Sequence, residues 1–454
     1  MSVTGEKSFA EKWLNLHDWV EWFAQFGVPR PISLGTLFLG FLAILAMEIP
    51  HIFVFGLGWL GGTAPIWLPV VLVRASWESW VRYVRSAFLS TTEPVLLEIK
   101  LPREITKSPR AMEIALNTLW QTGGETTFIN RAWRGRVRVW YSFEIASFGG
   151  DVHFYVWTWE SYRNVVEAAL YAQFPEIEIH IAEDYASKLQ YDPNIHDGFV
   201  NDYKLSKSNV YPIKSYIDFE LDKDPKEEFK VEPLAQMFEY LSSLRPHEQV
   251  WIQIMIRANH KSGGVLFPTN DSDTLKTLLQ KEIKNIRLES VPEEERANQF
   301  KFPNPTWRQR MQAEIIERHS GKLHFDVCAR AVYLIDSRKG SVVGSNIGIL
   351  RFIWKPLGNP GYLNEFNPDN SGGHNTINYP WQDFKGLHRQ SIMRQFLDAY
   401  RRRSSFYPPW TAAISTMSVE SIATLWHFPG SSVAAPGINR IPATKASPPP
   451  NLPK

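Results

Sequence analysis

The first strong pattern in the chain is an apolar stretch near the N-terminus. From Pro31 to Val73, Glu48 is the only formally charged residue. About 20 apolar residues in a helix cross the hydrocarbon core of a bilayer, so the stretch has room for one long span or two shorter ones. We predict a membrane anchor over residues 31–75, divided at Pro50. The side chains expected to contact lipid include Leu37, Phe41, Ile44, Phe53, Leu57, Trp67 and Val71.

A helical hairpin that turns at residues 48–51 is the favoured form of this anchor. Basic residues flank the apolar stretch on both sides: Lys7, Lys12 and Arg30 before it, and Arg74, Arg82 and Arg85 after it. Basic flanks stay in the cytoplasm, so both ends are expected inside. We therefore expect an inner (cytoplasmic) membrane protein whose soluble part faces the cytoplasm. The alternative is a single span over residues 49–73 after a half-inserted first segment.

The segments on either side of the anchor are predicted to be helical. Within residues 1–30 the apolar side chains recur at spacings of three and four, as in an amphipathic helix: Phe9, Trp13, Leu16, Val20 and Phe23. An aromatic face of this kind suits the headgroup layer of a membrane. Docking of this helix onto the protein's own soluble part is the alternative. Residues 76–92 are expected to form a helix that links the anchor to the soluble region.

Beyond the anchor the pattern changes to the two-residue alternation of half-buried strands. In the first strand Val95, Leu97 and Ile99 alternate with residues of the other face. Over residues 93–185 the order strand, helix, strand, strand, helix, strand follows, which is a ferredoxin-like (βαββαβ) domain. Each strand has one apolar face and each helix one apolar stripe. The pattern therefore predicts one antiparallel sheet covered on one side.

The same order is predicted a second time, over residues 210–429, after a linker at 186–209. The expected strands are 211–221, 249–258, 322–335 and 410–417, and the expected helices are 232–244 and 342–354. A helical insertion at 260–320 separates the second strand from the third. The predicted class is therefore α+β, with two ferredoxin-like domains in tandem behind a membrane hairpin. Residues 430–454 are rich in Pro, Ala and Ser and are expected to form a disordered tail.

Composition and motifs narrow the function classes. The net charge of +2 gives no general affinity for nucleic acid, and the single cysteine, Cys328, excludes an internal disulfide and a cysteine-based zinc site. The chain has no P-loop, and the common hydrolase, metalloprotease and dinucleotide-binding motifs are also missing. The sequence predicts a protein without catalytic residues, cofactor or metal. An enzyme whose catalytic groups converge from distant positions stays open.

The uncovered face of the first predicted sheet is a candidate interaction surface. It is expected to display Arg136, Arg138, Trp140, Tyr155 and Trp157, together with Glu98 and Glu144. Contact with another domain or subunit is the favoured interpretation, because exposed aromatic patches on sheets usually mark protein interfaces. Stacking of single-stranded nucleic acid is the alternative, although the acidic residues oppose it. Binding of a small ligand is a third possibility.

A second candidate surface is the only concentrated run of basic residues in the chain. It consists of Arg389, Arg394, Arg401, Arg402 and Arg403. A solvated helix face is the simpler interpretation. Contact with anionic lipid or with DNA is the sharper one.

Three stretches of the sequence are distinctive as a set. They are PVLLEIKLPREITKSPRAMEIALNTLWQTGG at 94–124, SFEIASFGGDVHFYVWTWESYRNVVEAALYAQFPEIEIHIAEDY at 142–185, and SVESIATLWHFPG followed by PPPNLP near the end. Together they resemble an uncharacterised family of bacterial membrane proteins. They are also similar to the region ahead of the motor domain in type IV secretion-like and conjugation-like ATPases. No catalytic residue is carried by this resemblance. Because the chain ends at Lys454 without a motor domain, the resemblance implies a non-motor partner of such an ATPase.

The functional hypothesis that combines these observations is a membrane-anchored scaffold or adaptor. It would dock a translocation ATPase or sister subunits at the membrane, with lipids as its other partner. The alternative is a membrane-tethered protein that binds single-stranded nucleic acid through Trp140, Tyr155, Trp157 and the arginine run.

Overall fold

The computed structural model describes most of the chain and divides it into two compact units. The described residues are 30–103, 105, 107–223, 231–260, 271–290, 304–369, 377, 379–408, 410–411, 414–430, 433 and 435–441. The N-terminal unit is Met1–Val81 with Thr376–Ser391, and the sheet unit is Arg82–Asn375 with Ile392–Lys454. The amphipathic helix predicted over residues 1–30 lies outside the described residues, apart from Arg30.

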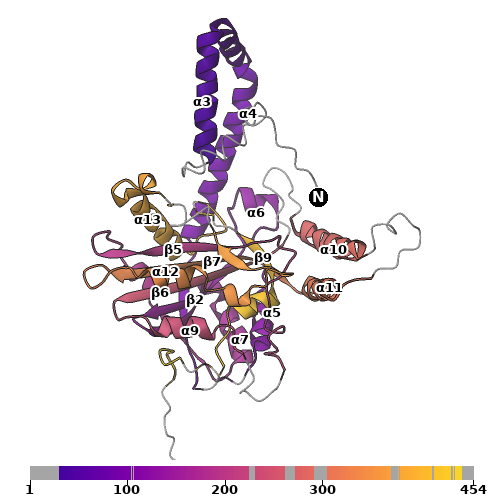
Figure 1. Cartoon of the computed structure of the whole chain (residues 1–454), viewed down its shortest axis with the longest axis vertical. Helices are drawn as coiled ribbons and strands as arrows, with labels where there is room; N and C mark the ends of the chain where they lie inside the picture. Colours follow the sequence, from indigo (N-terminus) through magenta and orange to yellow (C-terminus); the bar gives the residue numbers. More distant parts are fainter. Residues whose placement is uncertain are drawn as a thin grey trace, which may run out of the picture. The chain divides into compact units, whose positions relative to one another are not determined.

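The N-terminal unit is built on two apolar helices, α3 (Arg30–Glu48) and α4 (Pro50–Ser90), which Ile49 separates. Figure 1 shows α3 alongside the first part of α4. By length and composition, α4 is the one described helix that is long and apolar enough to cross a membrane. The apolar part of α3, Leu34–Glu48, is shorter. Pro65 and Pro69 lie inside α4, which is tolerated in membrane helices because neighbouring groups satisfy the freed backbone.

The linking helix predicted over residues 76–92 is helical as far as Ser90, as the last part of α4. These residues continue α4 without a break. No glycine or proline occurs between Pro69 and Ser90, so nothing in the local sequence ends the helix. A single helix therefore runs from the apolar stretch into the sheet unit.

The sheet unit contains one antiparallel sheet to which all nine described strands belong (Figure 1). The strands of its first half are β1 (Pro94–Lys100), β2 (Trp140–Phe148), β3 (Asp151–Trp159) and β4 (Glu178–Ala182). Those of its second half are β5 (His196–Leu205), β6 (Glu248–Ala258), β7 (His324–Asp336), β8 (Phe366–Pro368) and β9 (Ser415–Ser418). The order across the sheet is β4-β1-β3-β2-β6-β7-β5-β8, and β9 pairs with β7. The chain is thus an α+β protein with an antiparallel sheet, as predicted.

The two halves of the sheet have the same internal order. Counted within its own half, each runs fourth, first, third, second from the outer edge to the centre. The second strands of both halves, β2 and β6, meet antiparallel at the centre, with Phe143 opposite Ile254 and Glu144 opposite Gln253. The halves are therefore fused into one continuous sheet.

Helices and short 3₁₀ segments connect these strands. The α-helices of the sheet unit are α5 (Pro109–Thr118), α6 (Phe128–Ala132), α7 (Arg163–Gln173), α8 (Tyr185–Lys188), α9 (Ala235–Ser242), α10 (Asp271–Glu289), α11 (Trp307–Ser320), α12 (Gly344–Arg351) and α14 (Val419–Leu425). The helix α13 (Leu387–Arg401) begins in the N-terminal unit and ends in the sheet unit. The 3₁₀ segments are η1 (Glu160–Tyr162), η4 (Lys355–Leu357), η6 (Pro380–Gln382) and η7 (Phe384–Gly386).

Several predicted boundaries in the second half are wrong. The predicted linker 186–209 contains the strand β5, and the predicted strand 211–221 is a series of turns, with Asp218 N–H bonded to Ser215 C=O at 2.9 Å. The strand β8 lies outside all four strands predicted for the second half. In β5 both faces are buried, so its apolar residues Phe199, Val200 and Tyr203 do not alternate with polar ones. The two-residue period that identifies a half-buried strand is then lost.

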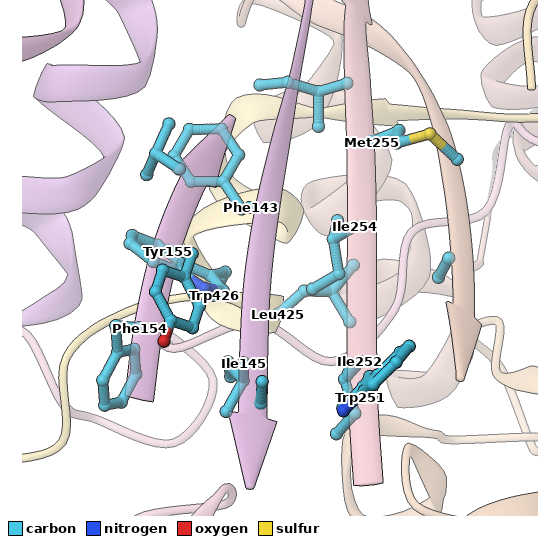
Figure 2. Close-up of a cluster of buried hydrophobic side chains, with 14 of the residues drawn as sticks. Phe143, Ile145, Phe154, Tyr155, Trp251, Ile252, Ile254, Met255, Leu425 and Trp426 are labelled. Atoms are coloured by element: carbon cyan, nitrogen blue, oxygen red, sulfur yellow. The ribbon is translucent and has the colours of Figure 1, made fainter. Parts of the chain in front are cut away.

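The face of the sheet nearest α14, here the α14 face, carries the main apolar core. Phe143, Ile145 and Phe154 point to this side, where Trp426, the residue after α14, packs 4.8 Å from Phe143 and 6.1 Å from Phe154 (ring centroids). Figure 2 shows Leu425 and Trp426 beside these strands. The helices α5 and α7 complete the same layer, through buried Met112, Leu116 and Val166 among others.

The C-terminal segment contributes to the core as well. Val433, Ala435 and Ile438 are buried, and Ile438 forms a parallel bridge with Val152. The prediction of a disordered tail over residues 430–454 is therefore wrong for these positions. Apolar side chains spaced among prolines still bury enough surface to hold a segment that lacks any regular pattern. Residues 442–454 lie outside the described residues.

The opposite side of the sheet, here the α13 face, is also covered. Residues 392–401 of α13 place Met393, Phe396 and Tyr400 against it, each no more than 1% exposed. The predicted sheet covered on one side is thus wrong. Alternation along a strand shows which face is more apolar, but not whether the chain returns to cover the other face.

Candidate functional site

The residues predicted to form an uncovered interaction surface are mostly buried. Arg138, Trp140, Tyr155 and Trp157 are only 3%, 5%, 7% and 7% exposed, and Arg136 alone is exposed. They lie on or beside the α13 face, under the protein's own chain. The predicted open face is therefore wrong for four of its five residues.

Two segments cover this corner of the sheet. The Tyr407 ring lies 5.9 Å from the Trp140 ring, and Tyr185 of α8 lies 5.0 Å from Tyr155 (centroid to centroid). The Arg403 guanidinium stands 5.9 Å from the Trp157 ring, within the range of a cation–π contact. The predicted protein contact of these aromatic residues is thus made within the same chain.

Arg403 is the centre of a buried ionic network. Although it was predicted as part of an exposed basic run, its side chain is 0% exposed. Its Nε donates to Glu144 Oε1 at 2.9 Å and its Nη2 to Glu144 Oε2 at 3.1 Å. Its Nη1 donates to Asp184 Oδ2 at 2.6 Å. Two carboxylates thus compensate one guanidinium in the fork geometry that suits arginine.

The ionisation of this network follows from its contacts. Burial alone would raise the pKa of Asp184, but the hydrogen bonds and charge of Arg403 outweigh burial and hold that pKa below its usual value. Burial would lower the pKa of Arg403, yet the charge of Glu144 and the hydrogen bonds to both carboxylates raise it well above its ordinary value. Asp184 and Arg403 are therefore both charged at neutral pH.

Glu144 also accepts bonds from neutral groups of two other elements, α8 and β6. The Tyr185 hydroxyl donates to Glu144 Oε2 at 2.7 Å, and Gln253 Nε2 donates to Oε1 at 2.9 Å. The Tyr400 hydroxyl of α13 lies 2.8 Å from that of Tyr185. Burial raises the pKa of both tyrosines well above the usual value, so both stay neutral. The network ties α8 and α13 to the centre of the sheet.

The other predicted basic residues do not form one patch with Arg403. Arg401 is half-buried and donates to the carbonyl oxygens of Ala186 and Leu189. Arg402 is exposed and pairs with Asp398 at 3.0 Å, and Arg394 is exposed on the same helix. Arg389 belongs to the N-terminal unit and lies 3.9 Å from Asp383. Of the five arginines, Arg403 and Arg401 bond other parts of the sheet unit, Arg394 and Arg402 are exposed, and Arg389 belongs to the N-terminal unit.

A pocket of about 420 Å³ lies beside the covered corner. Three tryptophans of the sheet form one wall: Trp140, Trp157 and Trp159. Phe406 and Tyr407, in the loop after α13, form a second wall, and the last turns of α4 form a third through Arg82, Arg85, Ser86 and Leu89. The Trp140 and Trp157 rings stack at 5.9 Å, and Trp159 meets Trp140 edge-on at 5.4 Å. All these residues belong to the sheet unit.

The charges around this pocket are mainly positive. Arg82, Arg85, Arg401 and Arg402 line it, and Asp184 is the one carboxylate among its described lining residues. Asp184 is already neutralised by Arg403. Arg85 lies 3.8 Å from Glu125 and 5.3 Å from the Tyr407 ring centroid. The pocket can therefore accept a ligand that joins an apolar body to a negative group, but it presents no nucleophile paired with a base.

A second buried cluster brings together a serine, a histidine and a carboxylate, as a catalytic triad does, but without the accessibility of one. His319 Nδ1 lies 2.5 Å from Ser418 Oγ, and His319 Nε2 lies 3.2 Å from Glu420 Oε1. All three residues are at most 3% exposed. Ser418 Oγ also caps α14 by accepting from Ser421 N–H. A serine that is buried and used as a helix cap is not presented to a substrate.

Glu420 is held ionised by its surroundings. Lys322 Nζ lies 2.7 Å from Oε2, Arg318 Nη2 lies 3.0 Å from Oε1, and Ser215 donates to the same carboxylate. Burial would raise the pKa of Glu420, but its contacts with His319, Lys322 and Ser215 outweigh burial and hold the pKa well below its usual range. The cluster fastens α14 to α11.

The residues predicted to contact lipid lie on α3 and α4. Their exposed fractions are large: Phe41 59%, Ile44 63%, Leu57 54%, Trp67 40% and Val71 53%. Leu37 and Phe53 are partly exposed. In water such a surface would be unfavourable, so these helices have the side-chain distribution of lipid-facing segments.

No group of three or more His, Cys, Asp or Glu residues in the described part of the chain is arranged to hold a metal ion. No protein-family model matches the chain, and no curated protein sequence is significantly similar to it. The pocket and the apolar helices therefore carry the functional argument.

The sequence patterns identified only some of the residues that line this pocket. Trp140 and Trp157 were singled out, whereas Arg82, Phe406 and Tyr407 were not assigned to the same site. The local signal was the sequence Arg401-Arg402-Arg403 followed after two serines by Phe406-Tyr407, which places basic and aromatic side chains close together along the chain. What brings this run to Trp140 is the packing of α13 on the sheet.

Proposed function

We propose that the protein is a membrane-anchored scaffold that docks a translocation ATPase or sister subunits on the cytoplasmic side of the inner membrane. In this proposal α3 and α4 form the membrane hairpin. The sheet unit is a pair of ferredoxin-like modules fused edge to edge. The protein supplies position and contact surface rather than chemistry.

The observation that carries this proposal is the course of α4. Its apolar part exposes large side chains such as Val70 and Val73, at 68% and 69%. In the same helix, residues 82–90 pack into the sheet unit: Val84 is buried and the Phe88 ring lies 6.1 Å from that of Trp159. A helix with an apolar exposed part and a part packed into a folded domain is suited to hold that domain at a bilayer.

The ferredoxin-like interpretation is supported by the repeated strand order. Each half follows the order βαββαβ, with α5 and α7 in the first half and α9 and α12 in the second, when α6, α10 and α11 are counted as insertions. The order fourth, first, third, second in both halves is the arrangement expected of this fold. Folds of this class serve many functions, so the scaffold role rests on the anchor and on the resemblance to ATPase-associated membrane proteins.

The alternative function, binding of single-stranded nucleic acid, receives no support from the site. Its stacking residues Trp140, Tyr155 and Trp157 are buried, and Arg403 is engaged with two carboxylates. A stacking platform needs open aromatic faces.

Cysteine labelling tests the membrane arrangement. In a Cys328→Ala background, single cysteines at Ser2, His51 and Lys339 are probed with a membrane-impermeant maleimide in spheroplasts of an expression host. We expect labelling at position 51 in intact spheroplasts, and at positions 2 and 339 only after permeabilisation. Labelling of both position 2 and position 51 in intact spheroplasts, without labelling of position 339, would indicate one span. Labelling of position 339 in intact spheroplasts would contradict the cytoplasmic placement.

The scaffold role is tested on the full-length protein extracted with a mild detergent. We expect light scattering after size exclusion to give a homo-oligomer or a stoichiometric complex with an ATPase. A monodisperse monomer, obtained from the native membrane under conditions that preserve other membrane complexes, would refute the role.

A further inference from the structure

We propose that the tryptophan-lined pocket at the end of α4 binds an anionic phospholipid, with its phosphate at the arginines and part of its apolar body against the tryptophans. This inference rests on the proposed membrane placement of α4 and goes beyond the scaffold role. It assigns a lipid site to the sheet unit itself.

The chemistry of the pocket selects an amphiphilic anion. Trp140, Trp157 and Trp159 present an apolar wall, and no acceptor among the described residues satisfies Trp140 Nε1–H. Arg82 is exposed and forms no ion pair with any described residue, and Arg402 is exposed beside a single carboxylate partner. A phosphate would supply the missing acceptor and compensate the excess positive charge.

The position of the pocket along α4 favours a membrane lipid over a soluble anion. Arg82 lies between Trp80 and Tyr83, whose side chains are 38% and 67% exposed. Aromatic residues alternating with arginine at the end of an apolar helix are typical of the headgroup layer. Under the proposed anchoring, the arginine that lines the pocket lies beyond the polar end of the apolar stretch, on the headgroup side of the membrane.

The neighbouring helix α6 has the same character. It exposes Ile129 and Trp133 at 57% and 56%, and Arg134 and Arg136 beside them are exposed. The turn after α6 packs directly on α4, since Gly135, at φ +61°, leaves no space for a Cβ against the Val84 carbonyl. Apolar aromatic side chains among arginines form a surface that suits anionic lipid. Two independent elements at this end of α4 thus point to the same ligand class.

Native mass spectrometry of the full-length protein in a mild non-ionic detergent tests the proposal. The probes are palmitoyl-oleoyl phosphatidylglycerol, the matching phosphatidylcholine, and inorganic phosphate. We expect one phosphatidylglycerol to bind in preference to phosphatidylcholine. Arg82→Gln and Arg402→Gln should each weaken it roughly fivefold, the effect of one basic residue near an anionic headgroup. The matched controls are Arg74→Gln, a charge on α4 outside the pocket, and Arg338→Gln, an exposed arginine paired with Asp336.

A second variant separates the pocket from general attraction of charge. Ser90 lines the pocket at its exposed edge, so Ser90→Trp should fill the space and abolish preferential binding without removing an arginine. Equal weakening by Arg74→Gln and Arg82→Gln, or unchanged binding by Ser90→Trp, would overturn the inference. Binding of inorganic phosphate with the affinity of phosphatidylglycerol would overturn it as well, because the apolar wall would then contribute nothing. Each of these results leaves the membrane fractionation of the protein, and so the proposed anchor, untouched.

Discussion

The two faces of the sheet are buried in different ways. On the α14 face Phe143, Ile145 and Ile254 meet apolar helices, and stability comes from removing apolar area from water. On the α13 face Glu144 and Arg403 are as completely buried, and they are tolerated because each has its full set of partners. The stability of the α14 face therefore depends on how well apolar side chains fill its core. The stability of the α13 face depends on whether each buried charged group has its partners.

This difference explains why the buried α14 face can be predicted from the sequence pattern and the buried α13 face cannot. An apolar face gives a regular alternation that needs no partner to be identified. A buried polar face has the same composition as a solvated one. Glu144, Gln253 and Arg330 form such a row, and all three are 0% exposed. Arg330 Nε lies 3.5 Å from Asp202 Oδ1, and its guanidinium lies 5.6 Å from the Phe396 ring centroid.

The sharpest test of the α13 face is Arg403→Leu. Removing the guanidinium leaves Glu144 charged and buried, and breaking a buried pair in this way costs about 3–5 kcal/mol. Chemical denaturation of the detergent-solubilised protein should show this loss. The neighbouring Arg402→Leu, at an exposed position, should change the unfolding free energy by less than about 0.5 kcal/mol. Equal effects of the two variants would mean that Arg403 is not in its buried network.

The corresponding test of the α14 face is Ile145→Ala. Its side chain is 0% exposed, so its truncation leaves a cavity and should cost about 2–5 kcal/mol. Ile181→Ala, on the edge strand β4 and 60% exposed, is the matched control and should cost far less. If Ile181→Ala were the more destabilising variant, the assignment of the two positions to core and edge would fail.

Asp202 makes the α13 face sensitive to pH. Burial, opposed by Arg330 and reinforced by Asp369, raises the pKa of Asp202 from 3.8 to about 6. The folded state then binds a proton more tightly than the unfolded state, so stability falls as pH rises from about 4 to about 6. The fall is up to about 3 kcal/mol, at 1.36 kcal/mol per pKa unit.

The measurement is the difference in unfolding free energy between the native sequence and Asp202→Asn as a function of pH. This difference should drop across that window and stay level from pH 7 to 8. A difference independent of pH between 4 and 7 would show that Asp202 titrates normally.

The smallest expected effect comes from repairing the α13 face. In Glu144→Gln with Arg403→Leu, the single amide oxygen can still accept from one of the two donors, Tyr185 or Gln253, which bond different oxygens of the native carboxylate. The buried carboxylate at position 144 is gone, and only the partly exposed Asp184 is left without its arginine. We expect the double variant to recover about 2 kcal/mol relative to Arg403→Leu, within the range of coupling between directly contacting residues. A thermodynamic cycle with Glu144→Gln alone measures this coupling. Strict additivity would mean that the charge of Glu144 is not what destabilises the single variant.

Two features of this protein were determined by local sequence. The apolar stretch from Pro31 to Val73 needs no partner to be identified, because its length and lack of charge are properties of the stretch itself. The first half of the sheet was also predicted in its correct order of elements. Val95, Leu97 and Ile99 alternate because their strand has one strongly apolar face, and α5 begins at the Ser108-Pro109 boundary expected of a helix.

Tertiary structure alone decided the cover of the α13 face, the strand β5 and the pocket. Arg403 and Glu144 are 259 positions apart, and only the return of α13 over the sheet turns a run of basic residues into a buried partner. A charged side chain carries no local mark of its final environment, because the free energy of burying it depends on a partner elsewhere in the chain. The same holds for Trp140 and Arg82, which become one site when α4, the sheet and the loop after α13 meet.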